Sequence, residues 1–250
     1  KFYIERLLVG NYTLVDTKTP DGYKTADPIN FELKETSEIQ TVVMRNEKQI
    51  FDFRVDKWIE KISINGKEQQ GTTIDNKEEM LKIDVGAKKV NTDKIKLIYR
   101  IRVSNVGELA GTVGRIVDEI PVGFNFEASE NQDYWRIEDN KLVCTAFEQV
   151  VLQPGESIDL QVILNWINGD SNFGVKTNIA KIENVTNQYN FEDIDESNNI
   201  SESNSIFSIR TGLEMILTKH IALVIISALL VISLLVIVEV KIMNRRKNNL

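Results

Sequence analysis

Residues 97–111 read LIYRIRVSNVGELAG, and apolar and polar side chains alternate along the first half of this segment. Tyr99, Ile101 and Val103 fall on one side of an extended chain, and two arginines between them fall on the other. A period of two residues is typical of a strand with one face in a core and the other in water. The segment therefore predicts a half-buried strand in the middle of the chain.

Strand-like runs recur on both sides of this segment and are separated by turn signals rich in Gly, Pro and Asn. The runs are residues 12–15, 29–33, 40–44, 51–55, 115–119, 141–146, 157–165 and 178–182. The turn signals are Pro20-Asp21-Gly22, Asn65-Gly66, Pro121-Val122-Gly123, Pro154-Gly155 and Asn168-Gly169. Only residues 78–81 suggest a short helix. Many short strands with such turns predict an all-β fold built from β-sandwich modules.

Composition and charge exclude several classes of function. The 250 residues contain 30 Lys and Arg against 37 Asp and Glu, and the net charge of −7 argues against nucleic-acid binding. The only cysteine, Cys144, cannot form an internal disulfide. The only histidine, His220, excludes a site with several His ligands and leaves little scope for a catalytic triad. We therefore expect no cofactor, no metal site and no enzymatic turnover.

A long apolar run near the C-terminus predicts a membrane anchor. Residues 221–238 read IALVIISALLVISLLVIV and contain no charged side chain. As a helix, this run would span about 27 Å, close to the ~30 Å hydrocarbon core of a bilayer. Four Lys and Arg follow within residues 241–250, and positive flanks stay in the cytoplasm. We expect one transmembrane helix over residues 215–240, in contact with the lipid bilayer of the cell membrane, and an extracellular N-terminal part.

The remaining boundaries follow from composition. Residues 1–48 form a first strand-rich unit, and residues 49–183 are numerous enough for a complete two-sheet core. Residues 184–214 are rich in Asn, Ser and acidic side chains, which is typical of a flexible linker. Because the sequence begins without Met or an apolar leader, we expect it to be the C-terminal part of a longer exported protein.

Two resemblances rest on these segments. GNYTLVDTKTPDGYKTADPINFEL (residues 10–33) and VVMRNEK (residues 42–48) resemble the C-terminal half of a collagen-adhesin B-type, SpaA-like and prealbumin-like domain of Gram-positive surface proteins and pilins. Residues 49–183 resemble the Ig-like modules of such proteins through FDFRVDKWI, LIYRIRVSNVGELAG, VDEIPVGFNF, LQPGES and TNIAKI, in this order. The resemblance implies a surface stalk or adhesin-like protein that projects an N-terminal region from the cell.

A second function stays open beside the stalk. The Ig-like module could itself bind a host or matrix protein through its loops. An exposed aromatic patch around Tyr134 and Trp135 would favour this alternative, whereas a position of these rings in the core would not.

Many members of both families carry an intramolecular isopeptide bond between Lys and Asn, formed with the help of a carboxylic acid. The reaction needs a neutral amine, a protonated acid and an Asn at attack distance, so all three must lie in an apolar core. By resemblance, Lys57 is the donor, Asp118 the acid and Asn178 the acceptor. Strand alternation places each of them on the same side as neighbouring apolar residues.

Other interpretations of these residues stay open. Lys57 could lie at a strand edge and extend its amine to water. Asp118 could stabilise the turn before Pro121. Asn105 also falls on the inward side of its strand and is a rival partner for the lysine, although the Val-Gly that follows it favours a turn.

In the first unit, the resemblance assigns Asp16 to the position of the family's catalytic Glu and Asn46 to the acceptor position. Asp is one methylene shorter than Glu, which reduces the reach of the acid. The donor lysine is expected on an earlier strand that these residues do not include, so the bond cannot form within them alone.

The family's sorting signal, Leu-Pro-x-Thr-Gly, precedes the hydrophobic span and the basic tail. Residues 208–212 read SIRTG at this place and keep only the final Thr-Gly. Cleavage by a sortase is therefore not expected, and the span is predicted to be a permanent anchor.

Overall fold

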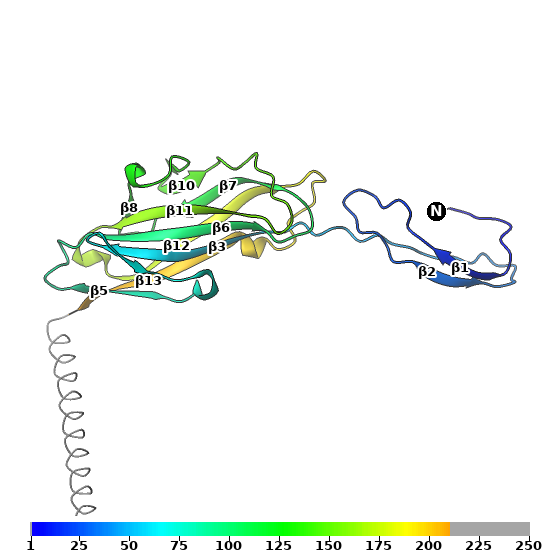
Figure 1. The fold of residues 1–250 in the computed structure, drawn as a ribbon, viewed down its shortest axis with the longest axis horizontal. Helices are drawn as coiled ribbons and strands as arrows, with labels where there is room; N and C mark the ends of the chain where they lie inside the picture. The colour runs from blue at the N-terminus through cyan, green and yellow to red at the C-terminus, as the bar shows by residue number, and fades with distance from the viewer. Residues whose placement is uncertain (1, 211–250) are drawn as a thin grey trace, which may run out of the picture.

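The computed structural model describes residues 2–210, and Figure 1 shows two separate β-structures in them. A small hairpin forms the N-terminal unit. A larger sandwich of two sheets follows it and contains the remaining strands. All regular structure in this part of the chain is β-strand or short 3-10 helix, which confirms the all-β prediction.

The two sheets of the sandwich are antiparallel except for one parallel pair, β13 and β5. The five-stranded sheet has the order β4 (Lys67–Gln70), β3 (Phe53–Ile64), β6 (Ile95–Asn105), β11 (Ser157–Trp166), β8 (Phe124–Phe126). The six-stranded sheet has the order β5 (Leu81–Gly86), β13 (Ile200–Arg210), β12 (Gly174–Thr186), β7 (Thr112–Glu119), β10 (Lys141–Cys144), β9 (Arg136–Glu138). The 3-10 helices are η1 (Ile74–Asn76), η2 (Ala128–Glu130), η3 (Asp170–Asn172) and η4 (Glu196–Asn199).

The predicted alternation of residues 97–111 is present in β6, at the centre of the five-stranded sheet. Tyr99, Ile101 and Val103 are fully buried, whereas the arginines between them remain partly exposed. The buried side chains of both sheets form one apolar cluster between the layers. Burial of this apolar surface is the main favourable term in folding, so the alternating segments hold the two sheets together.

The predicted turns form where the sequence placed them. Asn65 and Gly66 both have positive φ angles, of 52° and 80°, and join β3 to β4 as the two central residues of a hairpin. This conformation favours Asn-Gly because Gly has no Cβ to clash and Asn tolerates the left-handed region. Gly22, Gly123 and Gly155, in three other predicted turns, also have positive φ angles.

The predicted linker over residues 184–214 is wrong for part of its length. Residues 200–210 form β13, which lies inside the six-stranded sheet between β12 and β5. Ser201, Ser203 and Ser205 point inward on this strand, followed by Phe207. Composition indicated a linker because small polar residues fill buried positions that apolar side chains normally occupy. The second unit therefore continues to Arg210 and does not end at residue 183.

Two smaller predictions also differ from the structure. The helix expected at residues 78–81 is absent: residues 77–80 have no regular structure, and Leu81 begins β5, which pairs with β13. Residues 40–44 alternate between exposed and half-buried positions but pair with no strand among the described residues. Leu81 belongs to a strand because β13, from the end of the unit, pairs with it. Residues 40–44 form no strand because no described strand pairs with them.

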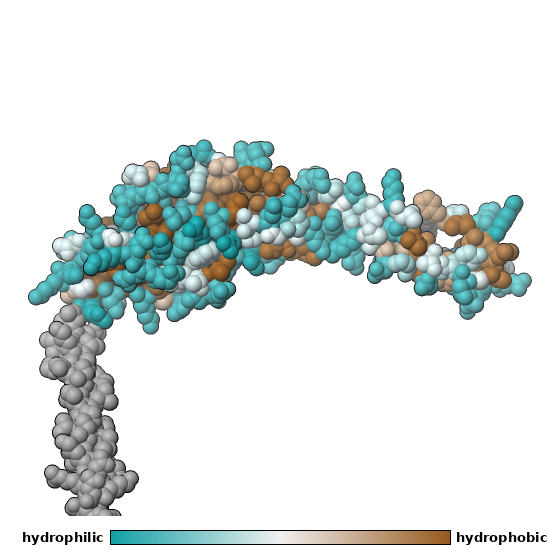
Figure 2. All heavy atoms as spheres, in the orientation of Figure 1, coloured by the Kyte–Doolittle hydropathy of each residue, from teal (hydrophilic) through white to brown (hydrophobic). Residues whose placement is uncertain are grey.

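The N-terminal unit contains one antiparallel pair, β1 (Gly10–Leu14) and β2 (Ile29–Leu33). Its inward side chains are only half-buried, and Phe2 and Leu8 are almost fully exposed. Figure 2 shows apolar atoms at the surface of this unit. Lys24 of the first unit forms an ion pair of 2.6 Å with Glu108 of the second.

No helix among the described residues is long and apolar enough to cross a membrane. The predicted transmembrane helix, residues 215–240, and the basic tail, residues 241–250, lie outside the described residues.

Candidate cross-linking site

Three strands from both sheets bring the predicted site residues of the second unit together. Lys57 lies on β3 of the five-stranded sheet, Asp118 on β7 and Asn178 on β12 of the six-stranded sheet. The side chains of all three are fully buried. The ammonium nitrogen Nζ of Lys57 contacts the carboxyl oxygen Oδ2 of Asp118 across the space between the sheets. Lys57 therefore does not extend to water, and Asp118 faces the core.

The register of the six-stranded sheet places Asn178 beside Asp118. Asp118 pairs with Ala180, so Asn178 is its diagonal neighbour on the same face of the sheet. Diagonal neighbours of this kind lie about 7–8 Å apart at the backbone, within reach of their side chains. Fully buried Leu142 and Ala180, each paired with Asp118, make the surroundings of the carboxyl group apolar.

Burial shifts the pKa values of Lys57 and Asp118 in opposite directions. It lowers the pKa of the Lys57 amine below its ordinary value, although the charge of Asp118 opposes this effect. Burial also raises the pKa of the Asp118 carboxyl group, although Lys57 opposes it. Both directions favour the neutral forms, because a low-dielectric interior disfavours charge. A neutral amine has a free lone pair, and a neutral carboxyl group has a proton to give.

The carboxamide of Asn178 lies next to Asp118 and to the hydroxyl group of Tyr99. Neither its oxygen nor its nitrogen makes a hydrogen bond of good geometry, and the same holds for Oδ1 of Asp118. A buried polar atom without a partner costs about 1–3 kcal/mol. Stability alone would favour apolar residues at these positions, so the buried polar groups call for another explanation, and a role in a reaction provides one.

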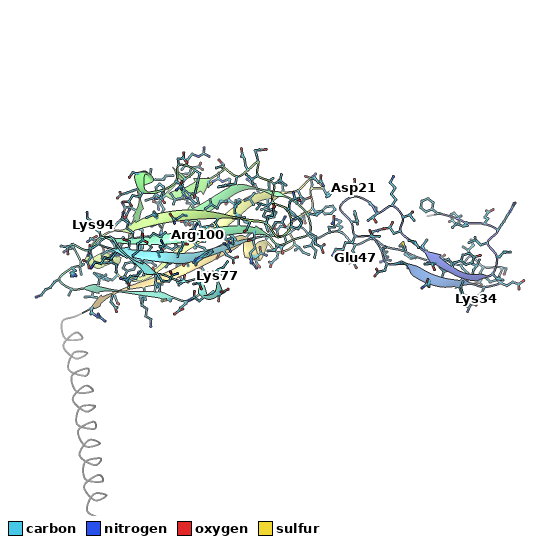
Figure 3. All side chains as sticks on the ribbon, viewed as in Figure 1. Asp21, Lys34, Glu47, Lys77, Lys94 and Arg100 are labelled. Atoms are coloured by element: carbon cyan, nitrogen blue, oxygen red, sulfur yellow. The ribbon has the colours of Figure 1, made fainter. Side chains whose placement is uncertain are left out.

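The cations that pair with Glu60 and Asp56 of β3 differ from Lys57. Arg100 and Lys77, both labelled in Figure 3, pair with Glu60 and Asp56. Arg100 and Lys77 each keep about a quarter of their side-chain surface exposed, whereas Lys57 keeps none. Lys57 therefore differs from these two cations, which remain partly exposed to solvent.

Asn105, the rival partner, has a structural role. Its side-chain nitrogen Nδ2 donates hydrogen bonds of 2.8 and 2.9 Å to the backbone oxygens of Leu109 and Leu152, and its oxygen accepts one of 3.1 Å from the backbone nitrogen of Gly107. It also pairs with Phe53, four residues before Lys57 along β3. The amide is thus fully used in holding the turn that follows β6, in agreement with the turn favoured by its sequence.

Sequence reasoning missed part of the site. Alternation predicts only that Tyr99 points inward, yet its ring centroid lies 4.5 Å from Nζ of Lys57. The inward serines of β13 were assigned to a linker, yet Ser201 accepts a hydrogen bond of 3.0 Å from the backbone nitrogen of Lys57. The alternation of Ser201, Ser203 and Ser205 with larger polar residues was the one available signal for a buried strand.

In the N-terminal unit, the structure also brings Asp16 and Asn46 together. Nδ2 of Asn46 donates a hydrogen bond of 2.6 Å to Oδ2 of Asp16. Thr19 and the backbone nitrogens of Lys18 and Ala26 donate to the same carboxylate. These hydrogen bonds, that of Thr19 first and that of Asn46 second, lower the pKa of Asp16. Asp16 is therefore stabilised as a carboxylate, unlike Asp118.

This arrangement predicts the acid behaviour of the N-terminal unit. A carboxyl group whose pKa is lowered on folding adds stability above the pKa of the unfolded chain, about 3.9, and loses that contribution as the pH falls through the lowered value. An NMR titration of the Asp16 carboxyl carbon in the full chain should therefore give a midpoint below 3.9, and Thr19→Val should raise it. A midpoint at or above the ordinary value would contradict the hydrogen-bonded arrangement.

Tyr134 and Trp135, which would form an exposed aromatic patch in a ligand-binding module, pack against the five-stranded sheet. Nε1 of Trp135 donates a hydrogen bond of 2.9 Å to the backbone oxygen of Gln161, and only 5% of Trp135 is exposed. Tyr134 accepts a hydrogen bond from the backbone nitrogen of Gln161. The pair is thus no exposed patch. Among the described residues, no group of three or more His, Cys, Asp or Glu side chains is arranged to hold a metal ion.

Comparisons with known proteins find a family match for the N-terminal unit. The family model of the SpaA prealbumin-like fold domain matches residues 1–48. No curated protein matches the chain. Similar solved structures include BcpA, the major pilin subunit of Bacillus cereus, at 16% identity and a TM-score of 0.34, which covers 80% of this chain and 55% of the pilin.

Two further solved structures are similar to the chain. The full-length major pilin SpaD from Corynebacterium diphtheriae is 14% identical at a TM-score of 0.27, and the match covers 79% of this chain and 46% of the pilin. The CARDB domain of a Pyrococcus furiosus protein is 15% identical at a TM-score of 0.31, and the match covers 64% of this chain and 97% of the domain. The chain spans about half the length of the two pilins. Residues 1–48 thus match the model of the family that their sequence resembles, the SpaA prealbumin-like fold domain.

Proposed function

We propose that this chain is the membrane-proximal part of a surface stalk of a Gram-positive cell, and that an isopeptide bond between Lys57 and Asn178 stabilises its second unit. The observation that carries the proposal is the fully buried set of Lys57, Asp118 and Asn178, contributed by three strands of two sheets. The match of residues 1–48 to the SpaA prealbumin-like fold domain supports a structural role, because these residues resemble such domains of surface proteins and pilins.

The proposed reaction conserves atoms and electrons without any cofactor. The lone pair of the neutral Lys57 amine forms a bond from Nζ to Cγ of Asn178, and the bond from Cγ to Nδ2 of Asn178 breaks. Asp118 gives its proton to the departing nitrogen and takes one from Nζ, so ammonia leaves and the acid is regenerated. The step happens once per chain and is not enzymatic turnover.

The bond would join the first strand of the second unit to a strand near its end, across both sheets. A covalent link of this kind limits how far the chain can extend when it is pulled, because force on the two ends must pass through the bond. In the proposed stalk, residues 215–240 hold the protein in the cell membrane and residues 241–250 stay in the cytoplasm. The degenerate sorting stretch SIRTG supports a permanent anchor over transfer by a sortase.

The intact mass of the purified full chain tests the cross-link. We expect the wild-type mass to be lower than the sequence mass by one ammonia. Lys57→Met removes the nucleophile but keeps a long apolar side chain in the core, and this variant should keep its full mass.

Lys61→Met is the matched control. Lys61 lies on the same strand and points outward to Glu68, so this variant should lose ammonia as the wild type does. Full mass in the wild type would rule out the bond and leave an uncross-linked sandwich. Loss of ammonia in Lys57→Met would show that another residue is the donor.

A further inference from the structure

Tyr99 occupies a place in the five-stranded sheet that mirrors the place of Asn178 in the other sheet. Lys57 pairs with Ile101 across β3 and β6, so Tyr99 is its diagonal neighbour on the same inward face. In the facing sheet, Asn178 is likewise the diagonal neighbour of Asp118. The diagonal pair of one sheet therefore faces the diagonal pair of the other across the core. Lys57 lies opposite Asp118, and Tyr99 lies opposite Asn178.

The side chain of Tyr99 thus contacts both partners of the proposed bond. The face of its ring lies 4.5 Å from Nζ of Lys57. Its hydroxyl group lies beside the carboxamide of Asn178 and the hydroxyl group of Ser205 on β13. The residue is completely buried, so bulk water does not compete for this hydroxyl group.

A purely structural role does not explain the hydroxyl group. It makes no hydrogen bond of good geometry, although Asn178 and Ser205 are its neighbours. An unpartnered buried hydroxyl group costs about 1–3 kcal/mol, and Phe would fill the same space without this cost. A donor that is incompletely paired before a reaction and aimed at a reacting group is the arrangement that stabilises charge in a transition state.

We propose that Tyr99 is a catalytic residue of the cross-linking reaction, and that its hydroxyl group donates a hydrogen bond to Oδ1 of Asn178 when negative charge develops there. This inference rests on the proposed function. When Nζ of Lys57 bonds to Cγ, the electron pair of the carbonyl bond moves to Oδ1. When Nδ2 leaves as ammonia, that pair returns and restores the carbonyl group. Tyr99 stabilises the intermediate state and loses no proton.

The other groups around Tyr99 fit this role. Burial, and the charge of Asp118 after it, raise the pKa of the Tyr99 hydroxyl group, which keeps it protonated as a donor. The hydroxyl group of Ser205, which is completely buried, lies beside that of Tyr99 and can orient it during the reaction. Tyr99 then stabilises the negative charge on Oδ1 of Asn178, so Asp118 is free to transfer the proton from Nζ of Lys57 to the departing nitrogen.

The test compares rates of bond formation in newly synthesised full chains. Wild type and Tyr99→Phe are made by cell-free translation, and their intact masses are followed over time. Removal of one oxyanion donor slows a reaction by about 10²–10³-fold, and we expect a slowing of this order for Tyr99→Phe. Tyr134→Phe is the matched control, because Tyr134 lies away from the site against β11, and it should react at the wild-type rate.

The outcomes separate the two proposals. If wild type never loses ammonia, the proposed function is wrong and the role of Tyr99 falls with it. If wild type loses ammonia and folded Tyr99→Phe does so at the same rate, only the role of Tyr99 is wrong. Far-ultraviolet circular dichroism checks the fold of each variant. If Tyr99→Phe does not fold, Ser205→Ala decides: slower bond formation supports the proposal, and an unchanged rate overturns it.

Discussion

Asp118→Ala is expected to keep the full mass of the chain and to be the most destabilised of the variants considered. Two effects combine. The bond no longer forms, because no acid moves the proton between the amine and the departing nitrogen. Lys57 also remains in the core without its partner, and breaking a buried pair in this way costs about 3–5 kcal/mol.

The missing cross-link adds a second loss of similar size. By analogy with disulfides, a link that closes a loop of about 100 residues stabilises a protein by about 4.7 kcal/mol, because it restricts the unfolded chain. The loop between Lys57 and Asn178 is slightly longer, at about 120 residues. Since a folded domain is stable by only about 5–15 kcal/mol, the variant is expected to be marginally folded at room temperature.

Urea unfolding followed by tryptophan fluorescence measures both effects. The double variant Lys57→Met with Asp118→Leu removes the unpaired amine as well as the bond. It should therefore recover the stability lost through the unpaired buried amine but not the stability lost with the cross-link. Its urea midpoint should lie between those of Asp118→Ala and wild type. Equal urea midpoints for Asp118→Ala and wild type would contradict both the buried pair and the bond.

Phe207→Ala is expected to lower the free energy of unfolding by about 3–5 kcal/mol, the usual cost of removing a large buried aromatic ring. Phe207 is 1% exposed on β13 and stacks on Trp166 of the facing sheet at a centroid distance of 5.3 Å. Its ring also meets Phe124 edge-on at 5.7 Å. The substitution would leave a cavity between the two sheets, because the surrounding strands are held by their hydrogen bonds.

Ile209→Ala on the same strand is the control for this variant. Ile209 is 41% exposed, so its truncation should cost well under half as much. Urea unfolding of the full chain measures both variants. Equal and small effects would mean that residues 200–210 do not pack in the core and that the linker expected from composition is correct.

The sequence was sufficient for the local features of the fold. The alternation around Tyr99 predicted β6, and Asn65-Gly66 predicted the hairpin between β3 and β4. Both depend on neighbouring residues only: one on the period of a strand, the other on backbone conformations open to Asn and Gly. The same alternation predicted that Lys57, Asp118 and Asn178 point into the core, since the face of a strand follows from residue parity.

The tertiary structure decided which strands are neighbours and what lies opposite each buried polar group. Parity shows that Asn105 and Tyr99 both point inward, but only the pairing of β3 with β6 puts Tyr99 next to Lys57 and Asn105 at a distant turn. Residues 200–210 have the composition of a linker. They form an inner strand of the six-stranded sheet because they pair with β12 on one side and with β5 on the other, and their small serines fill buried positions there. The identity of each side chain and its parity along a strand are local properties. The contacts of a buried polar group depend on segments far apart in the sequence, as with Lys57 and Ser201.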